Sequence, residues 1–444
     1  MNRREMLAST GVAMGGGALM SNLLAPVKAL ASDVKAIRIK NIETFNIELP
    51  ATPTEVEAGV MSRTAVTRVE TESGVRGYSF GGAGGGGILQ GGGGGRGGAS
   101  AGQGGAAQGS AAQSGARGGG GGGGFGGNAA GFQKMRDALV GTDLFAVEQH
   151  LKRGLLDWGG IEEALWDAIG KVAGQPVNRL LGGSKTSIPA YVTAVWRGGM
   201  DQSQVPTKDQ GAYALKLKNA GFQALKIRIF RPNFMDDVEA CAEGLAAAGP
   251  GFKMMVDRTA GSSGKLWDYA TGLAAAKALQ AVGVYWLEEP FARDDFEGPA
   301  RLAREMDPLL ITGGEGFRGL DAYRECLIHD TYDIIQPDLR NVGGLLTMRK
   351  VATLCEAFHK PCTGHGAFGL LVAGRIQVHA AWGAPWEEFA LASPPLLPQE
   401  QWAPALKILN SKELYTFRNG EVEVPQGPGL GLDLNEEALE HYRV

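Results

Sequence analysis

Cysteine and histidine are scarce in this chain of 444 residues, which has four of the first and six of the second. Cys241, Cys326, Cys355 and Cys362 have neither the spacing of a metal site nor the density of a disulfide-stabilised scaffold. We therefore expect reduced core cysteines. A metal-dependent hydrolase would want His-rich metal ligation, and it is a poor fit because the three candidate ligands, Asp257, Glu288 and Glu315, are all carboxylates.

An excess of charge of one sign is also missing, because 43 Lys and Arg face 47 Asp and Glu, a formal net charge of -4. This balance offers no general attraction for nucleic acid or anionic membranes, and we expect neither as a partner. Beyond residue 31 no run is apolar and long enough to cross a bilayer. The length and the 44% hydrophobic content allow two domains with a large core.

Residues 1–31 have the features of an export signal. Arg3 and Arg4 precede a mildly apolar, Gly-rich stretch, and Ala29-Leu30-Ala31 provides small residues for cleavage. The pattern predicts a twin-arginine signal peptide and a periplasmic or secreted protein. The alternatives are an amphipathic N-terminus or a membrane anchor, but Gly and Ser interrupt the stretch and make it weak for a permanent span.

Residues 33–150 predict a small α+β domain with a glycine-rich insertion. In the insertion, 81–127, glycine occupies 27 of 47 positions, without a collagen period or a phosphate-binding Lys-Ser/Thr. We expect a flexible segment with no chemical role. Strand patterns predict a three-stranded antiparallel sheet before the insertion, and helical periodicity returns after it; the strands are 34–49, 60–70 and 75–80, and the helices 131–140, 144–156 and 161–172.

From residue 188 to about 390, short apolar runs alternate with helical stretches and end in reactive side chains. The intervals between these side chains, 31, 31, 27, 23 and 27 residues, each suit one strand, one helix and two loops. A closed parallel series places all the strand ends on one face, where barrel enzymes keep their chemistry. We predict a (β/α) TIM-type barrel over 151–400, with 401–444 packing back on the first domain; its site residues are Lys226, Asp257, Glu288, Glu315, Asp338 and His365.

Three of these residues predict a metal site. Asp257, Glu288 and Glu315 follow three consecutive strands. Two carboxylates about 4 Å apart repel by roughly 4 kcal/mol at an effective dielectric near 20, so three need a cation. Hard oxygen ligands with room for substrate and water indicate Mg²⁺. Each residue taken singly could equally be a helix cap.

Lys226 and Arg228 are two apart on a strand, so both face the barrel interior. We expect the guanidinium to favour the neutral amine that a general base requires, and we assign Lys226 as a base. A structural pairing with neighbouring carboxylates is the alternative.

Asp338 and His365 follow later strands. A carboxylate on one ring nitrogen fixes the imidazole tautomer and makes a second acid/base, opposite Lys226. For His329, His359 and His379, inside probable helices, we expect only surface or packing roles. A base on each face and a cation between them suit removal of the proton next to a carboxylate.

The ordered motifs resemble those of the enolase superfamily, and within it the mandelate racemase subgroup. They are GIEEALWDAIGKVAGQPVNRLLGG, KIR, VDR, WLEEP, GGE, QPDLRNVGG, GHG and PGLGLDL. The resemblance implies a (β/α)7β barrel under a capping domain, the Mg²⁺ ligands and bases named above, and substrate carboxylate binding by Arg228 and Glu388. The choice of Glu388 over Glu387 stays open, and we expect a homo-oligomer.

For the activity, the resemblance implies dehydration of a sugar acid to a 2-keto-3-deoxy acid. A racemase or epimerase of a 2-hydroxy acid, and a non-catalytic secreted binder of acidic ligands, are the alternatives. The chain departs from the family where Arg228 replaces a usual lysine and where the insertion falls on a loop of the capping domain. The identity of the substrate therefore does not follow from the resemblance.

Overall fold

The computed structural model of the chain describes residues 36–84, 129–196, 206–261 and 266–444. The predicted signal peptide, and the glycine-rich insertion from residue 85 onward, lie outside these ranges. No helix within the ranges is long and apolar enough to span a membrane. All four cysteines are free and buried, as predicted.

The N-terminal part forms the predicted antiparallel sheet, in the order β1-β2-β3. Its strands are β1 (Ile39–Glu48), β2 (Arg63–Thr71) and β3 (Arg76–Phe80). A short helix, α3 (Pro53–Ala58), lies where we expected only a loop between the first two strands. It forms because Thr52 and Glu55 make a capping box around a proline in its first turn.

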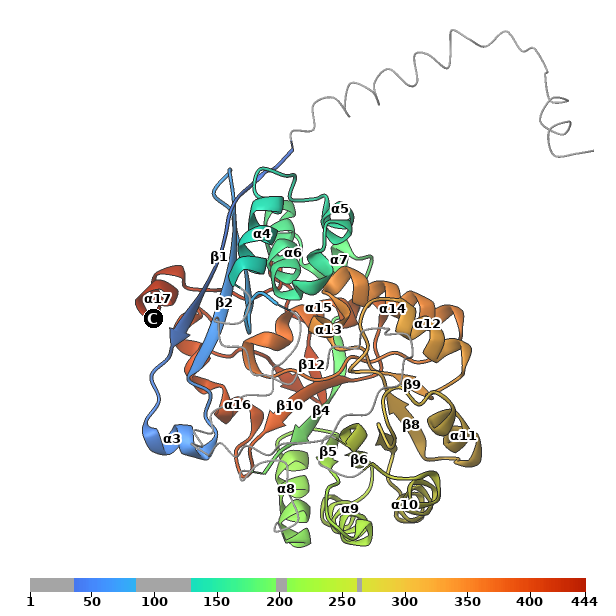
Figure 1. Ribbon diagram of the computed structural model, residues 1–444. Coiled ribbons are helices and arrows are strands. Elements are labelled where there is room, and N and C mark those ends of the chain that lie inside the picture. Colours follow the sequence, from blue (N-terminus) through green and yellow to red (C-terminus); the bar gives the residue numbers. More distant parts are fainter. Residues whose placement is uncertain (1–35, 85–128, 197–205, 262–265) are drawn as a thin grey trace, which may run out of the picture.

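Helix α6 packs against this sheet rather than against the barrel strands. Its apolar face, which includes Ile161 and Leu165, shares a buried cluster with Ile39 and Val69 of the sheet. Our boundary at residue 151 was therefore too early, because α6 completes the capping domain (Figure 1). The helices of this region are α4 (Ala129–Leu139), α5 (Val147–Lys152), η1 (Leu155–Asp157), α6 (Gly159–Ala173) and α7 (Val177–Leu180).

The second part is the predicted barrel. Parallel pairing runs from β4 through β9, and β10 pairs with β4. Isolated parallel bridges from Ile335 to Cys362 and from Ala367 to Phe389 place an eighth segment between β9 and β10, which closes the ring. The strands are β4 (Ser187–Ala194), β5 (Ala224–Arg228), β6 (Lys253–Asp257), β7 (Trp286–Glu288), β8 (Leu310–Gly313), β9 (Ile334–Ile335) and β10 (Glu387–Ala392).

Within the described part of the barrel, seven helices surround the ring, one after each barrel segment except the last, as expected for a (β/α)7β barrel (Figure 1). They are α8 (Thr207–Asn219), α9 (Phe234–Ala248), α10 (Tyr269–Val282), α11 (Glu297–Glu305), α12 (Asp321–Ile328), α14 (Leu345–Ala357) and α15 (Ala373–Trp382). Shorter turns, η2 (Thr259–Gly261), α13 (Leu339–Val342) and η3 (Gly369–Val372), lie in the loops at the strand ends.

A layer of apolar side chains fills the barrel directly below the predicted site. Ala224, Met255 and Trp286 are buried in one cluster with Tyr191 and Trp386. Each of the first three stands two residues before a predicted site residue, so its side chain lies on the same side of the strand as that site residue. The rings of Tyr191 and Trp286 meet edge to face, with centroids 5.2 Å apart. This layer closes the barrel from below and leaves the polar side chains at its carboxyl end.

The C-terminal segment contacts both parts of the molecule. Strand β12 pairs antiparallel with β4, and α17 lies beside β1, where its Glu436 pairs with Arg76 of β3 at 2.7 Å (Figure 1). The segment comprises α16 (Pro398–Gln401), η4 (Ala403–Ile408), β11 (Phe417–Arg418), β12 (Glu421–Glu423) and α17 (Glu436–His441).

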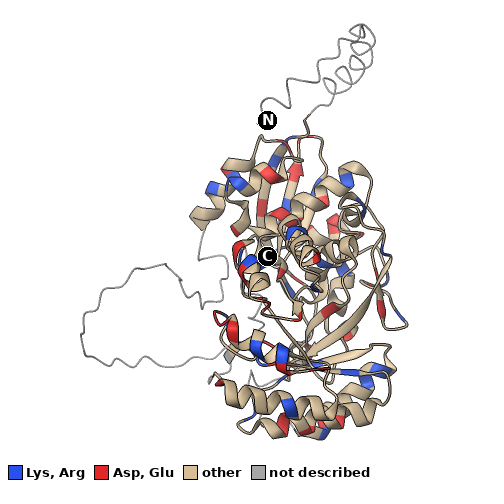
Figure 2. Cartoon of the chain, turned by 90° about the vertical axis from the view of Figure 1, so that its right-hand side faces the viewer, with Lys and Arg blue, Asp and Glu red and all other residues tan. Residues whose placement is uncertain are grey.

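Lys and Arg are interspersed with Asp and Glu over the outer helices (Figure 2).

The closest approach of sheet and helix in the capping domain gives a testable prediction. A Cβ atom at Gly77 would lie 2.1 Å from the Ala164 carbonyl oxygen and 2.5 Å from the Ala168 nitrogen, both backbone atoms. We expect Gly77→Ala to lower the free energy of unfolding by about 1–3 kcal/mol, measured in urea. Gly84→Ala, with no atom of the described residues within 4 Å of the added carbon, is the control. Equal stability of the two variants would contradict the close contact between Gly77 and the backbone of α6.

Candidate active site

The six predicted side chains gather at the carboxyl end of the barrel. Asp257 and Glu288 are the last residues of β6 and β7, and Lys226 is the middle residue of β5. Glu315 and Asp338 stand in the loops that follow β8 and β9, and His365 lies in the segment between β9 and β10. The fold thus places on one face the side chains that we grouped from their spacing in the sequence.

Lys226 is fully buried and forms two ion pairs. Its Nζ lies 2.7 Å from Glu288 Oε2 and 3.0 Å from Glu388 Oε1. Burial alone lowers the pKa of Lys226, but the two carboxylates outweigh it and raise the pKa above its ordinary value. Our expectation that Arg228 would favour the neutral amine is wrong for this set of contacts. The guanidinium lies instead toward Asp257, with Nε 3.8 Å from Oδ2.

Glu288 combines complete burial with one oxygen that lacks a donor. Oε2 accepts from Lys226 and, at 3.1 Å, from Gln336 Nε2. Oε1 has no hydrogen-bond partner within the described ranges. Burial raises the pKa of Glu288 to about 8; Lys226 opposes the shift, and Asp257 adds to it. A buried, unpaired carboxylate oxygen is costly unless a cation or proton meets it.

Glu315 is held by two cations. Its Oε2 lies 2.9 Å from His365 Nε2, and its Oε1 accepts from Arg293 Nη2. Although burial would raise the pKa of Glu315, His365 and Arg293 hold it well below its usual range. Among the residues that the structure describes, no group of three or more His, Cys, Asp or Glu is arranged to hold a metal ion. The ligand set thus stays a prediction.

Sequence reasoning missed Arg293, which lies five residues after Glu288 in the loop beyond β7. It donates to Glu289 Oε2 at 2.8 Å as well as to Glu315. Burial raises the pKa of Glu289 to about 8, and Arg293 opposes the shift. An i to i+4 spacing predicts a side-chain pair only on a helix, and Glu289 and Arg293 lie in a loop, so no sequence pattern signalled this pair.

Asp338 and His365 form the predicted pair. Asp338 Oδ2 lies 3.0 Å from His365 Nδ1, while Oδ1 accepts from the backbone N–H groups of Arg340 and Asn341, both at 2.9 Å. Asp338 is therefore also the N-cap of α13. Burial lowers the pKa of His365, but Glu315 and Asp338 together raise it well above the ordinary value.

Glu388, and not Glu387, faces the lysine. Its Oε1 accepts from Thr193 and pairs with Lys226. Burial raises the pKa of Glu388, but Lys226, His365 and the hydrogen bond from Thr193 outweigh it and lower the pKa to about 2. Its neighbour Glu387 pairs with Arg375 and His379 on the other side of the strand. The structure thus places the predicted residue of this pair in the site.

His379 is buried, in keeping with the packing role that we expected, but it also pairs with a carboxylate. Its side chain is completely buried, and Nδ1 lies 2.6 Å from Glu387 Oε2. Its place in α15, a helix buried on nearly all sides, removes it from the solvent. The other two histidines that we predicted in helices lie just beyond helix ends: His329 is partly exposed and 2.8 Å from Glu297, and His359 lies at an exposed turn.

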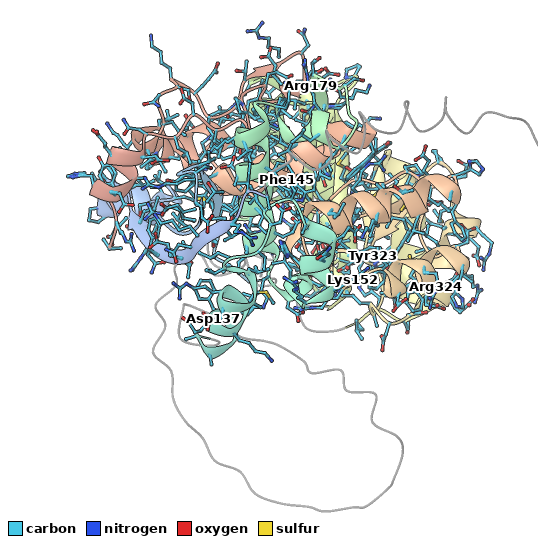
Figure 3. The ribbon with its side chains drawn as sticks, turned by 90° about the horizontal axis from the view of Figure 1, so that it is seen from above. Asp137, Phe145, Lys152, Arg179, Tyr323 and Arg324 are labelled. Carbon is cyan, nitrogen blue, oxygen red and sulfur yellow. The ribbon has the colours of Figure 1, made fainter. Side chains whose placement is uncertain are left out.

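The turn that carries Glu315 is fixed from behind by α12. Gly314 has φ +111°, which favours glycine, and its carbonyl accepts from Tyr323 Oη at 2.9 Å. Tyr323 is buried, whereas the next residue, Arg324, lies at the periphery (Figure 3). The loop is therefore anchored to the helix layer of the barrel.

The fold and site define a capped (β/α) barrel with acidic, lysine and histidine side chains converging at one mouth. Residues 211–438, just over half of the chain, match the family described as enolase C-terminal domain-like, and the chain belongs to this family. The predicted resemblance and the predicted fold are thereby confirmed.

The chain is similar to curated enzymes that are named for sugar acids and a sugar lactone. The chain is 29% identical over 295 residues to arabinonate dehydratase from Saccharolobus solfataricus, covering 66% of this chain and 74% of the relative. It is 28% identical to D-galactarolactone cycloisomerase from Agrobacterium fabrum, covering 71% and 85%.

A solved structure supports the fold along most of the chain. L-talarate dehydratase from Polaromonas sp. JS666, complexed with Mg and L-glucarate, has a TM-score of 0.66 and 21% identity. The match covers 92% of this chain and 98% of that one.

The double role of Asp338 gives a prediction about stability. Asparagine caps helices as well as aspartate does, so Asp338→Asn should change the free energy of unfolding by no more than about 0.5 kcal/mol, whereas Asp338→Ala should lower it by about 1 kcal/mol. Urea unfolding monitored by circular dichroism measures both. Equal losses in the two variants would show that the cap contributes nothing.

Proposed function

We propose that this protein abstracts the proton next to the carboxylate of a sugar acid and dehydrates the substrate to a 2-keto-3-deoxy acid. One observation carries the proposal. Lys226 and the Asp338–His365 pair stand on different barrel segments of one face, and three carboxylates occupy the strand ends between them. The sugar-acid dehydratases among the curated relatives support the substrate class.

In this proposal, one of two bases removes the proton at C2 of the substrate. The candidates are Lys226 on β5 and His365 in the segment between β9 and β10. They stand on either side of β4 and β10, so they can approach opposite faces of a bound substrate. Glu388 and Arg228 would hold the substrate's oxygen atoms beside Lys226. His365 would then give its proton to the departing C3 hydroxyl, so that the C3–O bond breaks and water leaves.

A divalent cation fits the donor set of the site. Three carboxylates of consecutive segments converge there, the pKa of Asp257 is raised by burial and further by Glu315, and Glu288 Oε1 has no donor within the described residues. We propose that Asp257, Glu288 and Glu315 hold Mg²⁺. When bound, it stabilises the negative charge that develops on the substrate carboxylate.

The dehydration is tested with a panel of aldonates, aldarates and their anhydro and lactone forms, assayed with Mg²⁺. We expect a 2-keto-3-deoxy product from at least one acid, no product after removal of divalent cations with EDTA, and recovery on adding Mg²⁺. Deuterium from solvent in recovered substrate, without any keto product, would favour a racemase or epimerase. Neither product nor exchange with any acid would favour a binder.

Single substitutions test the roles of the two bases. Because each removes a proton-transfer group, Lys226→Met and His365→Asn should each lower kcat/KM for dehydration by about 10²–10⁴-fold. Lys412→Met is a control for the loss of a lysine, since Lys412 is an exposed residue of the C-terminal segment. Retention of wild-type activity by either site variant would remove that residue from the mechanism.

Export and self-association extend the proposal. We propose that residues 1–31 direct the protein to the periplasm or the medium, and that the mature chain forms a homo-oligomer.

A further inference from the structure

A buried cluster of charged side chains lies behind the last two segments of the barrel. Arg375 and His379 come from α15, one helical turn apart, and Glu387 is the first residue of β10. At most 1% of each side chain is exposed. None of the three belongs to the set that we assign to substrate or metal, so the proposed reaction leaves the cluster unexplained.

Arg375 joins two segments that carry site residues. Its Nε and Nη2 lie 2.7 and 2.6 Å from Glu387 Oε1. The remaining donors reach backbone carbonyls: Nη1 donates to the carbonyl of His365, and Nη2 to that of Glu388. One planar guanidinium thus sets the distance between the chain at His365 and the chain at Glu388.

His379 connects the same two segments by a second route. The backbone N–H of Gly364, just before His365, donates to His379 Nε2 at 2.8 Å. Since that nitrogen must accept, the ring proton lies on Nδ1, which donates to Glu387 Oε2 at 2.6 Å. Burial lowers the pKa of His379, in keeping with a neutral ring.

The two glycines of the GHG motif allow this close packing. A Cβ atom at Gly364 would lie 2.4 Å from Met348 Cε and 2.6 Å from His379 Nε2. At Gly366 it would lie 2.5 Å from Glu388 Cδ. The residues on both sides of His365 are therefore pressed directly against His379 and Glu388.

We propose that Arg375, His379 and Glu387 are positioning residues, which fix His365 and Glu388 relative to each other without touching the substrate. The inference rests on the proposed function, because it matters only if His365 and Glu388 act there. Stability alone is a poor reason for the cluster, since apolar residues of similar volume often replace buried ion pairs without loss. Placement does supply a reason, because a misplacement of about 1 Å can cost 10²-fold in rate.

The test compares His379→Leu with His379→Gln. Leucine removes both the acceptor for Gly364 and the donor to Glu387, whereas glutamine can supply one of each. We expect kcat to fall by about 10–100-fold for leucine with KM changed less than about threefold, and glutamine to recover most of the loss. His150→Leu is the matched control: His150 is also completely buried, but it lies in α5 of the capping domain. Its kcat per folded molecule should stay at the wild-type value.

Solvent exchange at C2 separates positioning from a general loss of folding. Lys226→Met and His365→Asn first identify which of two C2-epimeric acids depends on each base. His379→Leu should then lower the His365-dependent exchange by about 10–100-fold and leave the Lys226-dependent exchange within threefold. An equal fall in both exchanges, or no fall in either, would overturn the proposal.

A structural measurement, which needs no turnover, tests the positioning role independently of the proposed function. Crystal structures of the wild type and of His379→Leu should differ by about 1 Å in the place of the His365 ring relative to Glu388. An unmoved ring would overturn the positioning role even in an active enzyme. Absence of turnover and exchange in the wild type, together with a displaced ring in the variant, would overturn only the proposed function.

Discussion

The pairing of Lys226 with two buried carboxylates is the interaction on which the site depends. Glu288 and Glu388 come from strands on different sides of β5, and the Lys226 side chain, whose ammonium group lies between them, is 1% exposed. Without the lysine, two anions would remain in an apolar barrel, and without the carboxylates an ammonium would. Either loss is far more costly than the net contribution of the intact arrangement to stability. The barrel tolerates these charges only as a balanced group, so their positions are mutually fixed.

Whether a feature of this site could be predicted from the sequence depends on whether local sequence patterns or tertiary contacts determine it. The barrel and the convergence of Lys226, Asp257 and Glu288 were predictable, because strand periodicity and the βα repeat alone bring successive strand ends to one face. The partners of those side chains were not. Arg293 on Glu315 and His379 on Glu387 depend on rotamers and on loops, which a spacing pattern does not contain. The state of Lys226 was predicted wrongly because its sequence neighbour Arg228 was weighed, while the spatially closer Glu288 and Glu388 decide it.

Our prediction of the boundary between cap and barrel was too early for a similar reason: it depends on contacts that a local sequence pattern does not contain. Helix α6 carries the paired glutamates Glu162 and Glu163, which look like exposed helix charges but are buried against the barrel. Glu162 accepts from the first N–H groups of α14, and Glu163 accepts from Arg340 Nη2 at 2.6 Å. The helix therefore has its apolar face on the sheet and its acidic face on the barrel. The helical periodicity of the sequence reveals only the apolar face. It does not reveal the acidic face, because the sequence does not distinguish a glutamate in a buried ion pair from an exposed one.

Arg340 extends this contact to the edge of the glycine-rich insertion. Two residues after Asp338, it donates to the carbonyls of Phe80 and Gly82 at 2.5 and 2.7 Å, while Ala83 O accepts from Gly160. The first residues of the insertion are thus fixed to the barrel. A Cβ atom at Gly160 would lie 2.0 Å from Gly82 O, so this junction has no spare room. Changes of length or composition beyond residue 84 are therefore separated from the Asp338–His365 pair by an anchored segment. This separation gives a physical reason why a barrel with an intact set of reactive side chains can carry so unusual an insertion in its cap.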